Sequence, residues 1–286
     1  MDISSKRVLL IGASGAIGKH LKNHWQLTAN IKLCTAGRSD QDDYYLDLNS
    51  PSNCPAHLFE ASHFDTVVVL AAMSNIAACE RDPQLARYIN AKAVEELYHI
   101  IPAKNWILFS TNQVFCGDKL MPRRNDITQP ISEYGASKVA LEKCFESQFY
   151  RVAILRLTKV LMPEQPFLRA SLKKMLSGEK VTAFTNMVMA PIYIEQVCQY
   201  ITRLLFDFSG GIHQLSGQRD ISYYQTLVML SSMLDLDVSL VEASKTGINT
   251  PKYSALHVDT LENSLGFFSP DIESVLGQFL AASRLN

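Results

Sequence analysis

The 286-residue sequence has no long hydrophobic stretch, because its longest uninterrupted apolar run is the seven residues 67–73. A membrane-spanning helix needs about 20 such residues. The apolar run that follows Lys6 and Arg7 is broken by Gly12 after four residues. A secretory signal peptide has an apolar region of roughly 7–15 residues. We therefore expect a cytoplasmic protein with neither a membrane span nor a secretory signal.

An excess of one charge is also missing, since 27 Lys and Arg oppose 28 Asp and Glu, and the formal net charge is −1. Nucleic acids and anionic membranes are bound largely through clustered positive charge, so we expect neither as a partner. The apolar content of 47% is ordinary for a globular protein. The length suits one doubly wound domain with a smaller lobe, or two small domains.

Cysteine pairs and metal-binding spacings are absent as well. The six cysteines lie far apart, at positions 34, 54, 79, 116, 144 and 198, and several fall inside predicted strands or helices. This distribution is typical of reduced thiols in a cytosolic protein. The seven histidines show no metal-ligand spacing. We therefore predict neither a disulfide framework nor a metal site.

Near its start the sequence contains a strand, a glycine turn and a helix in direct succession. Residues 8–11 are apolar and predict a buried strand, and residues 17–25 carry apolar side chains at helical spacing. Between them, Gly12 would permit a tight turn, Gly15 would let a pyrophosphate approach the backbone, and Gly18 would let the helix pack closely on the strand. This order is typical of a dinucleotide-binding unit.

The amino end of that helix would offer free N–H groups and a partial positive charge to phosphates. The spacing Gly-x-x-Gly-x-x-Gly differs from the usual Gly-x-Gly-x-x-Gly, and a tight strand-to-helix turn can require glycine for steric reasons alone. The strand before it and the helix after it favour phosphate binding. The predicted phosphate-binding residues are Gly12, Ser14, Gly15, Ala16, Ile17 and Gly18.

The end of the second predicted strand, residues 31–36, bears on the choice of cofactor. An NAD site usually has a carboxylate there for the ribose 2′-hydroxyl. Here Ala36 and Gly37 take that place, and the first charged residue is Arg38. An arginine can pair with a 2′-phosphate and stack on adenine, so NADP(H) is favoured and NAD(H) is the alternative. The alternative interpretation is that Arg38 is a solvent-exposed loop residue beside Asp40 and does not contact the cofactor.

Two more strand ends extend the cofactor site. The third strand is predicted over residues 44–48 and the fourth, which is rich in β-branched residues, over residues 66–70. Small residues after the fourth strand would leave room for a flat ligand, although helix packing alone could also select alanine. The cofactor-binding prediction therefore extends to Asp47, Leu48, Ala71 and Ala72.

The remaining pattern alternates strands and helices up to about residue 157. It predicts helices at 83–100, 133 onward, 167–176, 194–206, 223–234 and from Ser269–Pro270, and strands at 106–109, 151–157 and 212–215. Such alternation predicts an α/β fold, a Rossmann-like doubly wound parallel sheet with a smaller α/β lobe. We divide it into a dinucleotide-binding domain, residues 1–160 with 190–216 returning to it, and a substrate-binding lobe, residues 161–189 and 217–286.

Polar side chains follow the fifth predicted strand, and a Tyr–Lys pair opens the next helix. Thr111 stands at that strand end, and Tyr134 and Lys138 are one helical turn apart. With the three glycines and the two alanines, these residues resemble the extended short-chain dehydrogenases/reductases. Further stretches resemble the dTDP-4-dehydrorhamnose reductase branch; they are residues 79–90, 110–117, 126–135 and 256–266.

The resemblance implies an NAD(P)-dependent oxidoreductase that acts on a nucleotide-sugar in the synthesis of dTDP-rhamnose and polysaccharide. Tyr134 would donate a proton to the carbonyl oxygen, and Thr111 would orient that oxygen. A free tyrosine has a pKa of about 10. Lys138 would lower that pKa and hold the nicotinamide ribose, because a nearby ammonium favours the phenolate. A homodimer remains an option, since nothing in the sequence sets the oligomeric state.

The sequence departs from the reductase branch at three positions. Asn112 stands where an aspartate is usual, Arg124 where an acid is usual, and Lys159 where a tryptophan is common. Lys159 would contact a substrate pyrophosphate or remain a surface lysine. The predicted substrate-binding residues are Met73, Asn112, Gln113 and Lys159.

Reduction of a 4-keto nucleotide-sugar is the leading interpretation. A dehydratase would carry acids after the threonine, whereas Asn112 and Gln113 are amides that cannot transfer protons at neutral pH. An epimerase of the same fold remains open, because it needs only the tyrosine and a retained cofactor. A non-catalytic, NADP-binding regulatory subunit is the third interpretation, since the regulatory subunit of methionine adenosyltransferase resembles the same branch.

Overall fold

A computed structural model describes residues 5–53, 63–248 and 250–283. Its centre is a seven-stranded sheet in the order β11-β6-β5-β4-β1-β2-β3. All neighbouring strands in it are parallel, which confirms the predicted α/β class. The strands are β1 (Lys6–Ile11), β2 (Ile31–Gly37), β3 (Tyr44–Tyr45), β4 (Phe64–Val69), β5 (Ala103–Thr111), β6 (Val152–Leu157) and β11 (Gly211–Leu215).

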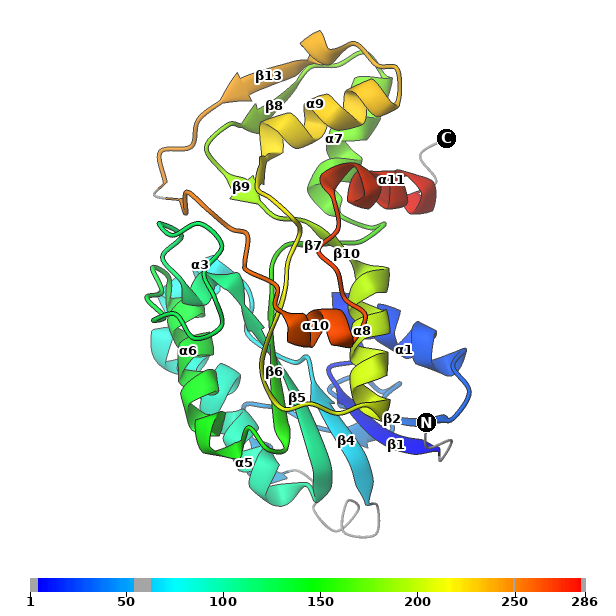
Figure 1. The fold of residues 1–286 in the computed structure, drawn as a ribbon, viewed down its shortest axis with the longest axis vertical. Helices are drawn as coiled ribbons and strands as arrows, with labels where there is room; N and C mark the ends of the chain where they lie inside the picture. The colour runs from blue at the N-terminus through cyan, green and yellow to red at the C-terminus, as the bar shows by residue number, and fades with distance from the viewer. Residues whose placement is uncertain (1–4, 54–62, 249, 284–286) are drawn as a thin grey trace.

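Helices cover both faces of this sheet (Figure 1). Side chains alternate along β1, so Val8 and Leu10 enter one apolar core and Leu9 and Ile11 the other. The first core also contains residues of α1 (Ala16–Gln26) and α8 (Ile194–Phe206), and the second contains residues of α5 (Ala93–Ile100) and α6 (Glu133–Phe145). A strand buried on both faces must be continuously apolar, as residues 8–11 are.

The chain reverses direction across the sheet between β1 and β4. It runs outward from β1 to β2 and β3, and then returns to β4 on the other side of β1. The loops at the carboxyl ends of these strands therefore diverge and leave a crevice, which is where doubly wound sheets bind ligands. The glycine turn follows β1 at this point.

A second group of elements lies beyond the carboxyl edge of the sheet (Figure 1). Its helices are α7 (Pro166–Leu176), α9 (Tyr223–Met233) and α11 (Ile272–Ser283). Its strand pairs are β8 (Val181–Phe184) with β13 (Val241–Ser244), β9 (Val188–Met189) with β12 (Ile221–Ser222), and β7 (Val160–Leu161) with β10 (Ile192–Tyr193). The short helix α10 (Thr260–Ser264) returns to contact β11. We refer to this group as the lobe, and its division from the sheet domain stays a prediction.

The predicted helix over residues 83–100 is confirmed, although its middle turn is a π turn. It divides into α4 (Pro83–Arg87), a π turn (Tyr88–Lys92) and α5, and α3 (Ile76–Arg81) precedes it. The wider turn contains Asn90, which is 1% exposed. Its side chain accepts a hydrogen bond from the Met73 N–H at 2.7 Å and donates to the Met73 carbonyl at 2.9 Å. The turn thus directs a polar side chain to the β4 loop.

Two element boundaries also differ from prediction. The third strand pairs only over Tyr44–Tyr45, because Asp47 begins a turn in which its carboxylate accepts the Asn49 N–H at 3.0 Å. The last helix begins at Ile272 instead of at Ser269–Pro270, since Asp271 accepts the Ser274 N–H at 2.7 Å and caps it. Ser222 and Gln225 form a capping box at the start of α9, because each side chain accepts a hydrogen bond from the backbone N–H of the other.

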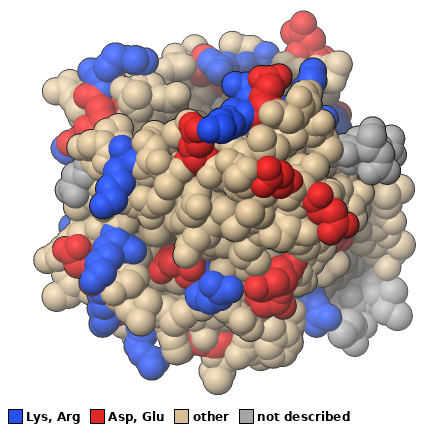
Figure 2. All heavy atoms as spheres, turned by 90° about the horizontal axis from the view of Figure 1, so that it is seen from above, with Lys and Arg blue, Asp and Glu red and all other residues tan. Residues whose placement is uncertain are grey.

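The surface carries charges of both signs. Figure 2 shows Lys and Arg separated from one another by Asp, Glu and wide uncharged areas on the face it presents. Cys34, Cys79, Cys116, Cys144 and Cys198 are free thiols, whereas Cys54 lies outside the described residues. In the part of the chain that the structure describes, no helix is both long and apolar enough to span a membrane.

Candidate active site

A large cleft of about 1530 Å³ opens at the carboxyl ends of β1, β4 and β5 and extends under the lobe. Every predicted site residue lines it. The cofactor set is Gly12, Ser14, Gly15, Ala16, Ile17, Gly18, Arg38, Asp47, Leu48, Ala71 and Ala72; the remainder are Met73, Thr111, Asn112, Gln113, Tyr134, Lys138 and Lys159. Met187, Met189 and Tyr223 form the lobe wall of the cleft, and no local pattern in the sequence predicts them.

Two of the three glycines in the turn, Gly12 and Gly18, occupy positions where the structure requires glycine, as the sequence predicts. Gly12 has φ +90°, and a Cβ there would lie 2.6 Å from the Ala71 nitrogen. A Cβ on Gly18 would lie 2.3 Å from the Gly12 carbonyl oxygen, so only glycine lets α1 approach β1 this closely. Gly15 has ordinary backbone angles and caps α1 without a side-chain hydrogen bond. The first N–H groups of α1 therefore remain available to a phosphate.

Arg38 lies at the outer end of the cleft, where β2 ends. It is exposed, and it forms no ion pair with any described residue. Asp47 also lines this end, and a hydrogen bond from the Asn49 backbone is the main reason that the pKa of its carboxyl is lowered. The positive charge of Arg38 also contributes to that lowering, and its exposed guanidinium can still bind an anionic group on a ligand.

Thr111, Tyr134 and Lys138 meet at the inner end of the cleft. Thr111 ends β5, and its Oγ1 accepts the Gln113 N–H at 3.3 Å in the turn that follows. Tyr134 is held at the start of α6, whose N-cap is Ser132, and it hydrogen-bonds Thr111. The Lys138 Nζ lies 6.0 Å from the centre of the Tyr134 ring.

The expected lowering of the tyrosine pKa by Lys138 is wrong. Burial raises the pKa of Tyr134 to about 12, and the hydrogen bond from Thr111 offsets only part of this rise. Burial also lowers the pKa of Lys138 to about 8, which weakens the ammonium as a source of positive charge. Desolvation is therefore the largest cause of both pKa shifts. Tyr134 stays a protonated phenol at neutral pH.

Two residues that support this cluster lacked an assigned role in the sequence. Asn90 donates to the Ser137 hydroxyl at 2.8 Å, and Ser137 donates to the Tyr134 carbonyl at 2.7 Å, so the π turn fastens the first turn of α6. Cys79 is fully buried, and its thiol donates to the Met73 carbonyl at 3.3 Å. Asn90 could have been recognised from the sequence, because it is a polar residue on the apolar side of a predicted helix.

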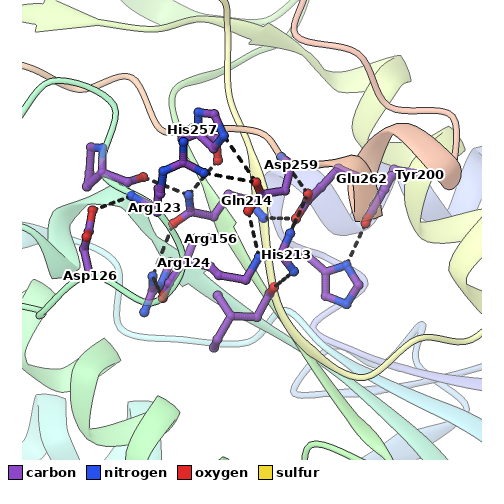
Figure 3. Close-up of polar contacts among 12 residues, drawn as sticks. Arg123, Arg124, Asp126, Arg156, Tyr200, His213, Gln214, His257, Asp259 and Glu262 are labelled. Atoms are coloured by element: carbon purple, nitrogen blue, oxygen red, sulfur yellow. Dashed lines mark hydrogen bonds and ion pairs between the residues drawn. The ribbon is translucent and has the colours of Figure 1, made fainter.

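A largely buried ionic network joins β6, α6 and α10, and Figure 3 shows the part of it around Arg124 and Arg156. Arg156 on β6 binds Glu142 on α6 through two hydrogen bonds, at 2.9 and 2.7 Å, and Glu142 also accepts from Ser110 at 2.6 Å. Arg124 binds Asp259 at 3.1 Å and Glu262 at 2.9 Å. Arg156 donates to the Arg124 carbonyl at 3.0 Å, which joins the two clusters.

This network explains one departure from the reductase branch. Arg124 contributes a positive charge to a site in which Glu262 is completely buried. Glu262 also accepts the Gln214 N–H at 2.9 Å, so the carboxylate links α10 to the edge strand β11. Arg124 therefore fastens the loop after β5 to α10 and lies apart from the residues that line the cleft.

The parallel sheet, the glycine turn at its reversal point and the Tyr–Lys pair beside a strand-end threonine define an extended short-chain dehydrogenase/reductase, a class of oxidoreductases. The chain belongs to the RmlD substrate binding domain family, which it matches over residues 6–285. The resemblance seen in the sequence is thereby confirmed.

Individual relatives are distant. The chain is 25% identical over 256 residues to the probable low-salt glycan biosynthesis reductase Agl14 of Haloferax volcanii, which covers 80% of this chain and 85% of that protein. It is 28% identical over 191 residues to dTDP-4-dehydrorhamnose reductase of Escherichia coli, covering 64% of this chain and 62% of that enzyme. The second match thus spans less than two thirds of the relative.

Two further comparisons extend over nearly the whole chain. The crystal structure of dTDP-4-dehydrorhamnose reductase from Bacillus anthracis in complex with NADP has a TM-score of 0.83 at 21% identity, and covers 97% of this chain and 99% of that one. This likeness shows a shared fold. Methionine adenosyltransferase 2 subunit beta of Bos taurus is 24% identical over 311 aligned positions, covering 99% of this chain and 91% of that protein.

Proposed function

We propose that the chain is an NADPH-dependent reductase of a 4-keto nucleotide-sugar. The observation that carries the proposal is the convergence of Thr111, Tyr134 and Lys138 on the same cleft as the glycine turn. The cleft volume of about 1530 Å³ exceeds the roughly 300–1,000 Å³ of an ordinary ligand pocket, and leaves room for a dinucleotide and a second nucleotide side by side. Family membership and the reductase relatives support the same activity.

The residues present fit NADPH. The uncapped amino end of α1 suits a pyrophosphate, and the unpaired guanidinium of Arg38 suits a 2′-phosphate. The Bacillus anthracis enzyme, which shares this fold, is complexed with NADP. Another protein of the same fold is complexed with NAD, so the choice of NADPH rests on Arg38. Lys138 would bind the nicotinamide ribose, since its ammonium lines the cleft and forms no ion pair with a described residue.

In this proposal NADPH supplies a hydride to the carbonyl carbon, and Tyr134 supplies the proton to the oxygen. A pKa of about 12 keeps the phenol protonated, which is the form that a proton donor needs. The Thr111 hydroxyl orients the carbonyl oxygen next to that phenol. Charge that develops on the oxygen is met by the phenol, the hydroxyl and the nearby ammonium of Lys138.

The nucleotide-sugar would lie between the sheet and the lobe. Lys159 lines this side of the cleft, and burial lowers the pKa of its ammonium. Pairing with a pyrophosphate would offset that desolvation. Met73, Asn112 and Gln113 would contact the sugar from the strand ends. In this arrangement residues 161–189 and 217–286 form the substrate-binding lobe over the sheet domain.

The alternatives are less well supported. A regulatory subunit would not require the intact set of Thr111, Tyr134 and Lys138, although a relative of that kind covers 99% of this chain. An epimerase requires the cofactor to be regenerated in each turnover, and a dehydratase requires proton-transferring acids where Asn112 and Gln113 stand. Reduction needs only the groups that meet in the cleft.

The direct test is a screen of nucleotide 4-keto-sugars with NADPH oxidation at 340 nm as the readout, which is roughly where reduced nicotinamide absorbs. We expect one NADPH consumed for each product formed. Product formation without net oxidation would move the assignment to an epimerase. A protein partner that co-purifies in fixed ratio, with every sugar unchanged, would favour the regulatory subunit.

The role of Tyr134 is tested by Tyr134→Phe, which keeps the ring and removes the proton. We expect turnover to fall by about 10²–10⁴-fold, the usual contribution of a general acid. The dissociation constant for NADPH should stay unchanged. Tyr150→Phe is the matched control, because Tyr150 is 74% exposed and does not line the cleft. Near-normal turnover in Tyr134→Phe would remove the tyrosine from the mechanism.

A further inference from the structure

Two segments of the chain cross between the sheet and the lobe beside one another. Residues 216–222 lead from β11 to β12, and residues 250–256 lead back from the lobe toward α10 (Figure 1). Backbone N–H groups of the second segment donate hydrogen bonds to side-chain oxygens of the first. The Ser254 and Ala255 N–H groups donate to Asp220 Oδ1 at 2.8 and 2.9 Å, and the Leu256 N–H donates to the Ser216 hydroxyl at 2.9 Å.

The other oxygen of Asp220 is unusual. Oδ2 is buried and has no hydrogen-bond partner among the described residues, and burial raises the pKa of this carboxyl. A buried polar atom without a partner costs about 1–3 kcal/mol. Stability alone would therefore not favour a carboxylate at this position. Buried polar atoms that lack a hydrogen-bond partner are most common at functional sites.

The second segment reaches the catalytic threonine through Asn112. The Asn112 Nδ2 donates to the Ser254 hydroxyl at 2.9 Å and to the Ser254 carbonyl at 3.2 Å. A carbonyl oxygen can only accept, so the group that faces it must be a donor. An aspartate at 112 would place an acceptor against an acceptor. This contact gives a physical reason for the amide at a position where the reductase branch usually has an acid.

The same contact orients the remaining end of the amide. With Nδ2 held by Ser254, Oδ1 faces Thr111 and accepts its hydroxyl proton at 3.3 Å. Thr111 is only 6% exposed, and its hydroxyl also hydrogen-bonds the Gln113 N–H and Tyr134. A chain of hydrogen bonds therefore runs from Asp220 through Ser254 and Asn112 to Thr111.

We infer that Asp220 is a positioning residue, which acts through Ser254 and Asn112 to hold the Thr111 hydroxyl in place for the carbonyl oxygen. The inference rests on the proposed function for its catalytic consequence. Thr250, Pro251 and Ser254 line the cleft, so a sugar bound under the lobe meets the same segment that holds Asn112. Substrate contact with this segment would therefore affect the orientation of the Thr111 hydroxyl.

Hydrogen exchange tests the hydrogen-bond chain without any need for turnover. In Asp220→Ala, we expect faster amide exchange in residues 252–257 and also in residues 111–115, which Asp220 does not touch. Asp220→Asn retains Oδ1 and should restore slow exchange in both segments. Faster exchange confined to residues 252–257 would overturn the inference, because Asp220 would then be a local support only.

The matched control is Asn186→Ala. Asn186 accepts the Thr246 N–H at 2.9 Å and donates to the Thr246 carbonyl at 2.9 Å, so it also fastens the chain that leads into residues 250–256. Its side chain has no recorded contact with Asn112. This variant should speed exchange near Thr246 and leave residues 111–115 unchanged. Equal acceleration at residues 111–115 would mean that any loosening of the lobe reaches the site, and would overturn the specific chain.

Kinetics test the consequence. With a 4-keto nucleotide-sugar as substrate, Asp220→Ala should lower kcat by about 10–100-fold, as expected for a misplaced catalytic group, with KM within about threefold of the original. A rise in KM at unchanged kcat would overturn the positioning role. If Asp220→Ala does not fold, Asn112→Asp breaks the chain at its other end and should lower kcat while exchange at residues 254–255 stays slow. A wild-type protein that reduces no nucleotide-sugar would refute the proposed function and leave the exchange result standing.

Discussion

The buried pair of Arg156 and Glu142 gives the sharpest stability prediction. Their side chains are 4% and 9% exposed and form two parallel hydrogen bonds, at 2.9 and 2.7 Å. In Arg156→Met the Ser110 hydroxyl would be the one hydrogen-bond partner that the Glu142 carboxylate keeps among the described residues. Breaking a buried pair from one side costs about 3–5 kcal/mol, because the remaining charge is left uncompensated. We expect the free energy of unfolding to fall by that amount.

Urea denaturation measures this loss. Both tryptophans, Trp25 and Trp106, are at most 1% exposed, so their fluorescence reports loss of the core directly. The control is the double variant Arg156→Met/Glu142→Leu, which removes both charges and should recover most of the lost stability. A single variant within about 1 kcal/mol of the original protein, or a double variant as unstable as the single one, would refute the reasoning.

Three other outcomes are expected. Arg38→Ala should weaken NADPH binding by about 1.5–3 kcal/mol and leave NADH binding unchanged, as measured by titration calorimetry; equal affinities in the original protein would contradict the cofactor assignment. Gly18→Ala should abolish NADPH binding, because its Cβ would lie 2.3 Å from the Gly12 carbonyl oxygen. Burial lowers the pKa of His213 to about 4. The unfolded chain therefore binds more protons between about pH 6.5 and pH 4, and stability should fall by up to about 3 kcal/mol as the pH drops through that range. His213→Gln should remove this dependence in urea titrations, and an unchanged dependence would assign it to other groups.

Local patterns in the sequence were sufficient for the sheet and for the glycine turn. Continuous apolar runs marked strands that are buried on both faces, and the spacing of the glycines matched positions where a Cβ has no room. The same logic placed Tyr134 and Lys138 on one face of α6. All predicted site residues reach one cleft because parallel strands bring their carboxyl ends to a single edge.

What the sequence did not reveal depends on partners far along the chain. Asn112 and Ser254 are 142 positions apart, so no local pattern records their hydrogen bond. The rise in the pKa of Tyr134 depends on desolvation by the assembled site, whereas the sequence showed only the nearby lysine. The π turn at Asn90 also accompanies a tertiary contact, with the Met73 backbone, that no local pattern predicts.

The ion pairs of Arg124 also affect the order in which the protein folds during translation. Its acidic partners, Asp259 and Glu262, are made 135 and 138 residues later. At a translation rate of about 5–20 residues per second, this delay lasts roughly 7–28 s. Over that interval the guanidinium stays hydrated, and the loop that carries it has no acidic anchor. The ribosome must therefore deliver almost the entire chain before that loop can close on the edge of the sheet.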